Sequence, residues 1–224
     1  MQQQKRGRQV ASKWLKTVAL LASPKAAPHI PRTKPFNRKR LHRMLRRYGV
    51  VVLKPVRGGG GLGVMKVSRQ GGGYLYAYKS RTRKFGSFRG VWKAVHRARR
   101  RRPYLIQQGI DLACYKQRPI DFRLKYMKRN GRWRFVAILG KIAKPGLFVT
   151  NICRGGTLVS GSKGLSLSFP SKEAEAKKRE MRELTKTCTK LLERRFPGIR
   201  QLGYDYGIDR NGHIWILEVN TRPQ

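Results

Sequence analysis

The sequence predicts an α+β protein of antiparallel β-sheet with packed helices, and three features lead to that class. Runs rich in β-branched and aromatic residues, such as 50–53, end at turn signals and are typical of strands. Asn-Gly pairs at 130–131 and 211–212 are favoured hairpin turns between such runs. Residues 171–195 carry apolar side chains at helical spacing. The 224 residues suffice for one large domain or two small ones.

Four helices are expected from capping residues and apolar stripes. They are residues 11–22, residues 37–48 with Asn37 as cap, residues 87–101 with Ser87 as cap, and residues 171–195 with Ser171 as cap. The expected buried stripe of the last is Met181, Leu184, Cys188, Leu191 and Leu192. Four prolines make residues 23–37 an extended connector between the first two helices.

The expected strands form hairpins. They are 50–53, 64–67, 74–78, 104–106, the pair 120–127 and 133–142, and the pair 201–208 and 213–219. A glycine-rich loop at 58–63 joins the first two strands.

Charge is the unusual property of the composition. The chain has 53 Lys and Arg against 10 Asp and Glu, a formal net charge of +43. The first acidic residue is Asp111, so residues 1–110 hold 29 Lys and Arg and no acid. Such a surface attracts polyanions, including nucleic acid, nucleotides, anionic lipid and acidic polymers. A general bias of the proteome, or a merely solvated face, explains the composition equally well.

The composition and cysteine usage also indicate in which cellular compartment the protein lies. No stretch approaches the length of a membrane-spanning helix, and the apolar run 18–22 is shorter than a signal-peptide core. The three cysteines form no C-x-x-C pair, which argues against a structural zinc site. A reduced, cytoplasmic setting is the simplest interpretation.

The strongest chemical signal lies in the last hairpin. A two-residue turn at Asn211-Gly212 pairs residues whose numbers sum to 423, which sets Asp205 opposite Glu218, about 5 Å apart. Asn220 then points to the same face. Like charges directly opposite destabilise a sheet, and a divalent cation such as magnesium would resolve the repulsion. Neutralisation by nearby arginines, or a slipped register, remains the alternative.

The second signal is Lys54 followed by the glycine-rich loop between two strands. Glycines let backbone N–H groups approach phosphate oxygens, and a lysine adds a positive charge. The string Gly58-x-Gly60-x-x-Gly63 matches the dinucleotide fingerprint, but a strand follows it where that fingerprint needs a helix. The P-loop and the protein-kinase motifs are absent from the sequence. A flexible hairpin remains the alternative.

Two weaker signals lie between these motifs. The segment 107–110 follows a strand and can offer backbone groups to an adenine edge. Asp121 and Arg123 share one face of a strand, and a structural ion pair between them is the simplest interpretation.

In this order, the segments resemble the ATP-grasp superfamily. The strand–Lys54–glycine-loop unit resembles its nucleotide-cradling hairpin, and 203–205 with 217–223 resembles its metal-binding end. Within the superfamily the chain is similar to the YheC/YheD endospore coat-associated proteins. The segments that carry this similarity are 12–14, 31–33, 48–49, 104–110, 121–123 and 150–156, and the resemblance spans about 12–223.

The resemblance implies an ATP-grasp-like fold, in which two lobes of antiparallel sheet with packed helices sandwich a nucleotide. It also implies a division of the chain. Residues 1–47 would be a basic N-terminal segment, the remnant of a region that precedes the ATP-grasp fold in relatives. Residues 48–105 would form the small lobe with the glycine loop, and residues 106–224 the large lobe with the metal-binding hairpin.

The resemblance further implies roles for individual residues. Arg123 and Lys141 would face the transferring phosphoryl group or the acyl substrate. The nucleotide, ATP, would be held by Lys13, Lys54, Gly58, Gly59, Gly60, Gly61, Gly63, Gln107, Gln108, Ile110, Asp111 and Asn151. Magnesium, or manganese in its place, would be held by Asp205, Glu218 and Asn220. Gly155 and Gly156 would shape the substrate side.

The implied function is ATP-dependent ligation of a carboxylate to an amine through an acyl phosphate, with both substrates unknown. The implied location is the cytoplasm, with a link to the endospore coat. Two alternatives remain open. One is a non-catalytic spore-coat or scaffold protein that keeps the fold. The other is a basic protein that binds nucleic acid or another polyanion, which strong salt dependence without ATP dependence would indicate.

Overall fold

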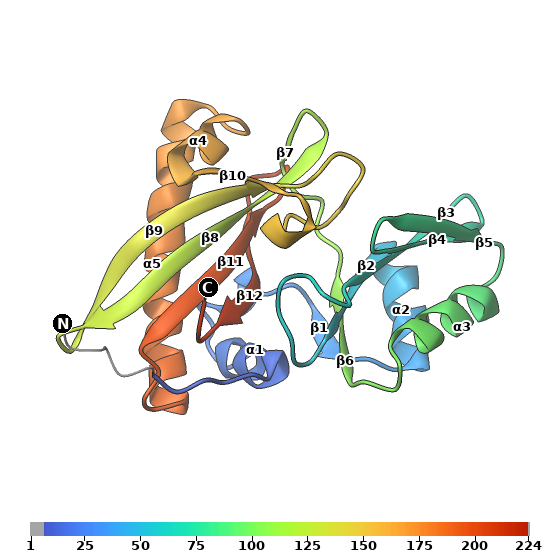
Figure 1. Ribbon diagram of the computed structural model, residues 1–224, viewed down its shortest axis with the longest axis horizontal. Coiled ribbons are helices and arrows are strands. Elements are labelled where there is room, and N and C mark those ends of the chain that lie inside the picture. The colour runs from blue at the N-terminus through green and yellow to red at the C-terminus, as the bar shows by residue number, and fades with distance from the viewer. Residues whose placement is uncertain (1–6, 224) are drawn as a thin grey trace.

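Two antiparallel sheets form the framework of the computed structural model, which describes residues 7–223 (Figure 1). The first sheet has the order β1 (Thr33–Pro35), β6 (Tyr104–Gln108), β2 (Val50–Pro55), β3 (Met65–Gln70), β4 (Gly73–Tyr78) and β5 (Arg81–Phe85). The second has the order β10 (Thr157–Ser160), β9 (Arg132–Ile142), β8 (Arg118–Arg129), β11 (Gln201–Ile208) and β12 (Ile214–Asn220), with β7 (Cys114–Tyr115) paired to β8. The class expected from the sequence is confirmed.

The helices divide between the two sheets. They are α1 (Lys13–Leu21), α2 (Arg38–Tyr48), α3 (Phe88–Ala98), α4 (Gly161–Ser166) and α5 (Ser171–Arg195), with short 3₁₀ turns at Ala27–His29 and Ile152–Arg154. The first sheet, α2 and α3 enclose one hydrophobic core. The second sheet, α1, α4 and α5 enclose the other. We call these two layers the small lobe and the large lobe.

The two small-lobe helices begin where their capping residues predict. The side chain of Asn37 accepts the backbone N–H of Arg40 at 2.8 Å, and that of Ser87 accepts the N–H of Gly90 at 3.2 Å. These bonds satisfy amide groups that the first helical turn leaves unpaired. The helix after Ser87 ends at Ala98, which is shorter than the expected 87–101. The first helix is likewise 13–21 where 11–22 was expected.

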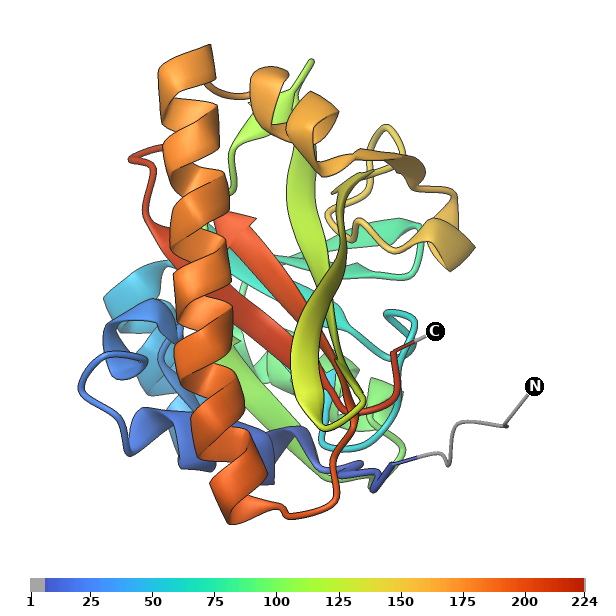
Figure 2. The ribbon, with the colours of Figure 1, turned by 90° about the vertical axis from the view of Figure 1, so that its left-hand side faces the viewer.

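The long helix α5 crosses one face of the large-lobe sheet, with α1 beside its C-terminal half (Figure 2). Four residues of its expected stripe are buried, and Leu191 is partly buried. Pro170 occupies the cap position that was expected for Ser171, which is the first helical residue. The hydroxyls of Thr185 and Thr189 share hydrogen bonds with Tyr206 and Tyr204, at 2.8 and 2.9 Å, and so register α5 against β11.

That register fixes the direction of the side chains on β11. Successive residues of a strand point to opposite faces. Tyr204 and Tyr206 face α5 and are fully buried, so Asp205 between them points to the opposite face of the sheet. The same alternation on β8 sends Phe122 into the core and its neighbours Asp121 and Arg123 to the opposite face.

The last hairpin pairs as expected near its open end but turns differently at its tip. Asp205 lies opposite Glu218, which confirms that pairing. The tip, however, is a three-residue turn closed by Asp209 and His213, so the two-residue Asn211-Gly212 turn is wrong. The cause is the side chain of Asp209, which accepts the N–H groups of Asn211 and His213 at 3.0 and 2.9 Å.

A β-bulge restores the expected pairing further along the hairpin. The residues nearest the tip pair with a sum of 422, for example Ile208 with Ile214, one less than expected. Leu217 is then an extra residue on β12, between the pairs Tyr206–Ile216 and Asp205–Glu218. The bulge therefore offsets the longer turn, and the two carboxylates face each other for a different reason from the one the sequence suggested.

The N-terminal part of the chain is shared between the lobes. Strand β1 pairs with β6 and α2 packs on the first sheet, whereas α1 packs against α5 and β12. Residues 1–6, part of the basic segment expected at 1–47, lie outside the described residues. The division at 47/48 and 105/106 stays a prediction. In the part of the chain that the structure describes, no helix combines the length and apolarity needed to span a membrane.

Candidate functional site

A cleft between the lobes gathers most of the residues singled out in the sequence. From the small lobe it is lined by Val52, Lys54, the loop residues 58–62, Lys66 and Gln107. From the large lobe it is lined by Asp121, Arg123, Lys141, Asn151, Asp205, Glu218 and Asn220. Four of the ten acidic residues of this very basic chain line the cleft, and five of the other six lie on α5. All but one of the carboxylates therefore lie either at the cleft or on α5.

A row of charged side chains crosses the floor of the cleft because three neighbouring strands align them. Arg123 on β8 lies opposite Asp205 on β11, which lies opposite Glu218 on β12. One step along, Asp121 on β8 lies opposite Lys141 on β9. Cross-strand neighbours on one face are close enough to pair, so the sheet sets a cation beside each aspartate and places the two carboxylates Asp205 and Glu218 side by side.

Asp205 is held by two cations. The guanidinium of Arg123 donates from Nε to Oδ1 at 2.6 Å and from Nη2 to Oδ2 at 2.8 Å, and Lys141 donates to Oδ1 at 2.8 Å. Burial works to raise the pKa of this carboxyl, but Lys141 and Arg123 together outweigh it and hold the pKa of Asp205 below its usual value. The carboxylate is therefore ionised at neutral pH.

Asp121 does not pair with Arg123, contrary to the interpretation from the sequence. Its Oδ2 accepts the hydroxyl of Thr150 at 2.5 Å. Its Oδ1 lies 2.9 Å from Nζ of Lys141, a charge contact without hydrogen-bond geometry. Burial raises the pKa of Asp121 above its usual value, because it outweighs the attraction of Lys141. Lys141, placed between Asp121 and Asp205, has a raised pKa since their attraction exceeds the effect of its own burial.

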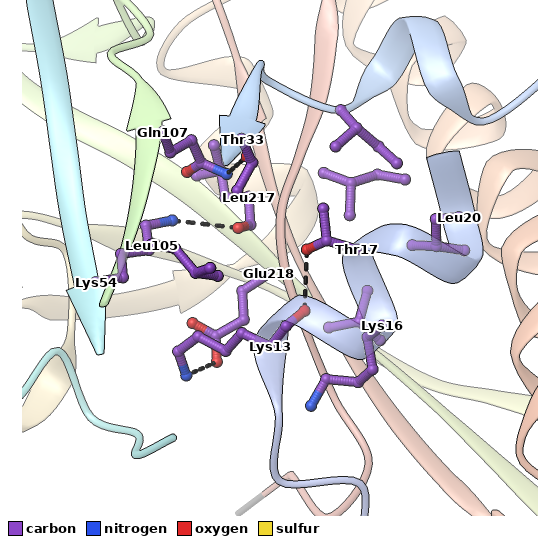
Figure 3. A pocket seen from close by; sticks show the side chains of 13 residues that line it. Lys13, Lys16, Thr17, Leu20, Thr33, Lys54, Leu105, Gln107, Leu217 and Glu218 are labelled. Atoms are coloured by element: carbon purple, nitrogen blue, oxygen red, sulfur yellow. Dashed lines mark hydrogen bonds and ion pairs between the residues drawn. The ribbon is translucent and has the colours of Figure 1, made fainter. Parts of the chain in front are cut away.

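Glu218 is held from the other side by α1. Nζ of Lys13 donates to Oε1 of Glu218 at 2.7 Å (Figure 3). It also donates to the carbonyl of Gly58 at 2.5 Å. Helix α1 begins beside the cleft because Ser12 caps it and Lys13 donates its backbone N–H to the carbonyl of Val56. One lysine therefore connects the N-terminal helix, the carboxylate on β12 and the glycine loop.

Two further lysines surround this carboxylate. Nζ of Lys54 on β2 donates to the carbonyl of Leu217 at 3.2 Å, which joins the small lobe to β12 (Figure 3). Burial lowers the pKa of Lys54, and the attraction of Glu218 only partly opposes this. Lys16 lines a small adjoining cavity and not the cleft. Its burial lowers its pKa from 10.5 to about 8.

The glycine loop reaches across to the large lobe. Four of its glycines have positive φ, 122° at Gly58, 62° at Gly60, 69° at Gly61 and 78° at Gly63, which L-residues adopt only with strain. A Cβ at Gly61 would lie 2.4 Å from Oδ1 of Asn151, and Sγ of Cys153 donates to the carbonyl of Gly60 at 3.1 Å. The absence of side chains is what lets this loop close on residues 151–153.

Fifteen of the nineteen residues singled out for the site line the cleft, and four do not, among them Gly155 and Gly156. Gly63 lies outside it, where its carbonyl accepts the hydroxyl of Tyr104 at 3.0 Å. Gln108 also lies outside it. Gln107 and Gln108 belong to β6 itself, where the sequence suggested a segment after the strand. The amide of Gln107 donates to the hydroxyl of Thr33 at 3.0 Å.

Among the cleft residues that the sequence did not single out are Lys66, Phe148 and Thr150. Lys66 lines it from β3, with Nζ 5.9 Å from the ring centroid of Phe148. The alternation of β3, in which Met65 and Val67 are buried, was a signal that Lys66 points to the other face. Thr150 and Phe148 belong to an irregular loop whose side-chain directions no local pattern predicts.

The donors on β11 and β12 fit a magnesium ion. Two carboxylates, Asp205 and Glu218, share the cleft with Asn220, whose Nδ2 lies 3.5 Å from Oδ2 of Asp205. Magnesium prefers oxygen donors and is usually held by one or two carboxylates together with substrate phosphates. Within residues 7–223 no three His, Cys, Asp or Glu side chains come together as a complete metal cage. The set therefore suits an ion that phosphate oxygens also coordinate.

A glycine-loop hairpin on one sheet, a lysine on its first strand and facing carboxylates on a second sheet define an ATP-grasp protein. Comparison with protein families gives the same result. Residues 4–224 match the model of the YheC/D-like ATP-grasp family, so this chain belongs to that family.

Two Bacillus subtilis (strain 168) proteins are similar over nearly the whole chain. Endospore coat-associated protein YheD is 30% identical over 225 residues, which cover 95% of this chain and 48% of YheD. Endospore coat-associated protein YheC is 26% identical over 230 residues, which cover 97% of this chain and 61% of YheC. The chain thus spans about half to three-fifths of the length of these relatives.

Solved structures share the fold at low sequence identity. A carboxyaminoimidazole ribonucleotide synthase from Aspergillus clavatus, complexed with ATP, has a TM-score of 0.58 at 12% identity over 97% of this chain and 46% of its own. D-alanyl-alanine synthetase A from Vibrio cholerae has a TM-score of 0.55 at 15% identity over 95% of this chain and 55% of its own. These similarities confirm the ATP-grasp fold predicted from the sequence.

Proposed function

We propose that this chain binds ATP with magnesium in the cleft and uses it to join a carboxylate to an amine. One observation carries the proposal. Asp205 and Glu218 face each other on two neighbouring strands, and Asn220 lies beside them. The glycine loop lines the same cleft, together with Lys54 from the small lobe and Lys13 from the large lobe. A phosphate chain under the glycine loop would place its oxygens near these carboxylates, and magnesium is usually held by one or two carboxylates together with substrate phosphates.

The small lobe supports the nucleotide end of the proposal. The N–H groups of residues 58–61 and the charge of Lys54 suit phosphate oxygens. For the adenine edge, the N–H of Gln108 is taken by the carbonyl of Arg32 and that of Gly109 by the carbonyl of Val50, both at 2.9 Å. Ile110 is the first residue past these bonds that lines the cleft, so we assign the adenine contact to its backbone.

Arg123 and Lys141 support the chemical step. Transfer of the γ-phosphoryl group from ATP to a carboxylate oxygen gives an acyl phosphate and ADP. An amine then attacks the acyl carbon, phosphate leaves, and an amide forms. Both cations sit beside Asp205 at the floor of the cleft, where they would stabilise negative charge on the transferring group. Magnesium supplies further charge neutralisation when bound.

The acceptor and the location belong to the same proposal. The substrates are a carboxylate and an amine of unknown identity, on the side of the cleft lined by residues 148–151. Gly156 lies outside the cleft, but it lets the chain pass close to this side, because a Cβ there would lie 2.4 Å from the carbonyl of Thr150. The names of YheC and YheD suggest a link to the endospore coat, and the free cysteines Cys114, Cys153 and Cys188 are the support for a cytoplasmic setting. A non-catalytic scaffold would keep the fold without needing facing carboxylates in the cleft.

Calorimetric titration of ATP, with and without magnesium, tests the proposal. High salt suppresses unspecific binding of nucleotide to a chain of charge +43. We expect one-to-one, saturable binding that magnesium strengthens. Binding that only fades with salt and ignores magnesium would contradict it.

Substitution of Gly61 by Ala should weaken ATP binding about tenfold. Alanine at φ 69° costs about 1 kcal/mol, and its Cβ would push the loop away from Asn151. Gly72→Ala is the matched control, since Gly72 has a φ of 77° but open space around its Cβ. The same titration measures both variants, and equal ATP affinities for the two would show that closure of the loop on Asn151 does not matter.

A further inference from the structure

The outer side of the small lobe is uniformly basic. We call the exposed surface of α2, β5 and α3 the basic face. Every charged side chain on these elements is Arg or Lys, because residues 1–110 contain no acid. Exposed cations follow one another at helical spacing, as Lys39, Arg43 and Arg46 on α2 and as Arg89, Lys93 and Arg97 on α3. No ion pair found within residues 7–223 involves any of these six.

The two helices form one continuous surface. They pack side by side on the same face of the first sheet (Figure 1), with the rings of His42 and Phe88 4.8 Å apart and those of Phe36 and Trp92 5.7 Å apart. The other face of that sheet contributes Val52 and Lys66 to the cleft. The basic face therefore points away from the nucleotide site, and its charges are not part of that site.

Folding does not account for these charges. Cations in the first turn of a helix oppose its dipole, yet Lys39 and Arg89 occupy first turns that contain no acid. Like charges four residues apart repel, as in the series Arg89, Lys93 and Arg97. Helix α5 of the same chain differs in its charge pattern, because three of its lysines each pair with a glutamate three residues away. The basic face thus carries repulsion that a bound polyanion would relieve.

We propose that the basic face binds the phosphate backbone of a nucleic acid, without reading its bases. Of the 22 cations in residues 33–108, 15 are Arg. The planar guanidinium group of Arg matches the geometry of phosphate oxygens, and Arg is over-represented at sites that bind phosphate. The stripe from Arg89 to Arg97 extends about 12 Å along α3. Over that length a DNA duplex presents about seven phosphates.

The test compares two charge-matched triple variants in binding to a short fluorescent DNA duplex. The first replaces Arg89, Lys93 and Arg97 by Gln. The second, the control, replaces Arg179, Lys190 and Arg194 by Gln, which are also exposed on a helix and make the same change in charge. A third variant, with Lys39, Arg43 and Arg46 replaced by Gln, repeats the test on α2. Unchanged magnesium-dependent ATP binding shows that each variant is folded. If the unsubstituted chain does not bind ATP, an unchanged circular dichroism spectrum shows the same.

We expect the α3 and α2 variants to lose at least about tenfold in affinity for the duplex at about 0.1 M salt. The slope of log affinity against log salt should become shallower by about 2.7, which is about 0.9 for each of three lost phosphate contacts. The control should change both much less. Equal losses in all three variants would overturn the proposal, because net charge alone would then explain binding. So would displacement of the duplex by polyglutamate as effectively as by DNA of equal charge, since the face would then favour an acidic protein.

Discussion

Replacing Glu218 by Gln should abolish the magnesium-dependent part of ATP binding. The substitution keeps the shape of the side chain but removes one of the two facing carboxylates, and Lys13, at 2.7 Å from Oε1, is left with a neutral amide in place of its charged partner. Loss of one member of a part-buried charged set costs about 2–5 kcal/mol, so the ATP affinity in magnesium should fall at least about thirtyfold. ATP affinity without magnesium should change much less, because the glycine loop and Lys54 remain. Titration of ATP at fixed high salt measures both.

Glu193→Gln is the matched control for this experiment. Glu193 is also a partly exposed glutamate paired with a lysine, Lys128 at 2.5 Å, and it accepts the indole N–H of Trp133 at 2.9 Å, outside the cleft. It should bind ATP and magnesium like the unsubstituted chain. If Glu218→Gln keeps the full response to magnesium, the assignment of the metal to β12 is wrong.

Replacing Lys54 by Met should weaken ATP binding both with and without magnesium, by about tenfold or more. The reason is that Lys54 contributes its charge directly to the phosphates in our proposal, and charge-assisted hydrogen bonds are worth about 1.5–3 kcal/mol. Lys54 also donates to Leu217 at 3.2 Å, so its loss loosens the contact between the lobes. The ratio of affinities with and without magnesium should stay near that of the unsubstituted chain, unlike the result for Glu218→Gln.

Lys16→Met controls for the removal of a buried lysine near Glu218. Lys16 is 4% exposed and lines only the adjoining cavity, where it donates to the carbonyl of Val10 at 2.6 Å. Its replacement should leave ATP affinity unchanged, because it does not reach the cleft. Equal losses in the two variants would mean that Lys54 acts through the general charge around Glu218 and not through contact with phosphate.

Local signals in the sequence were enough for the elements whose ends depend on their own residues. Asn37 and Ser87 start α2 and α3 because their side chains cap the next turn, and that chemistry is readable from the sequence. The short strands β1, β5, β7 and β10 were not predicted, since each exists only by pairing with a neighbour distant or turned back in the sequence. Their residues carry no clear alternation.

The candidate site was predictable in membership but not in its contacts. Asp205 and Glu218 were placed opposite each other, but the turn and the bulge that set this pairing depend on the side chain of Asp209 and on tertiary packing. Asp121 was expected to contact Arg123 and instead contacts Thr150 and Lys141. These partners come from other strands and loops, so no reading of one strand identifies them.

The bulge at Leu217 also separates the length of the turn from the pairing of Asp205 with Glu218, which depend on each other in a regular hairpin. In a regular ladder, any change in the length of the tip would shift every pair, and Glu218 would point into the core with each one-residue slip. Here the extra residue takes up the difference next to the carboxylate. It also presents its carbonyl to Lys54 of the small lobe. The two lobes therefore contact each other at the same residue where the hairpin restores its register.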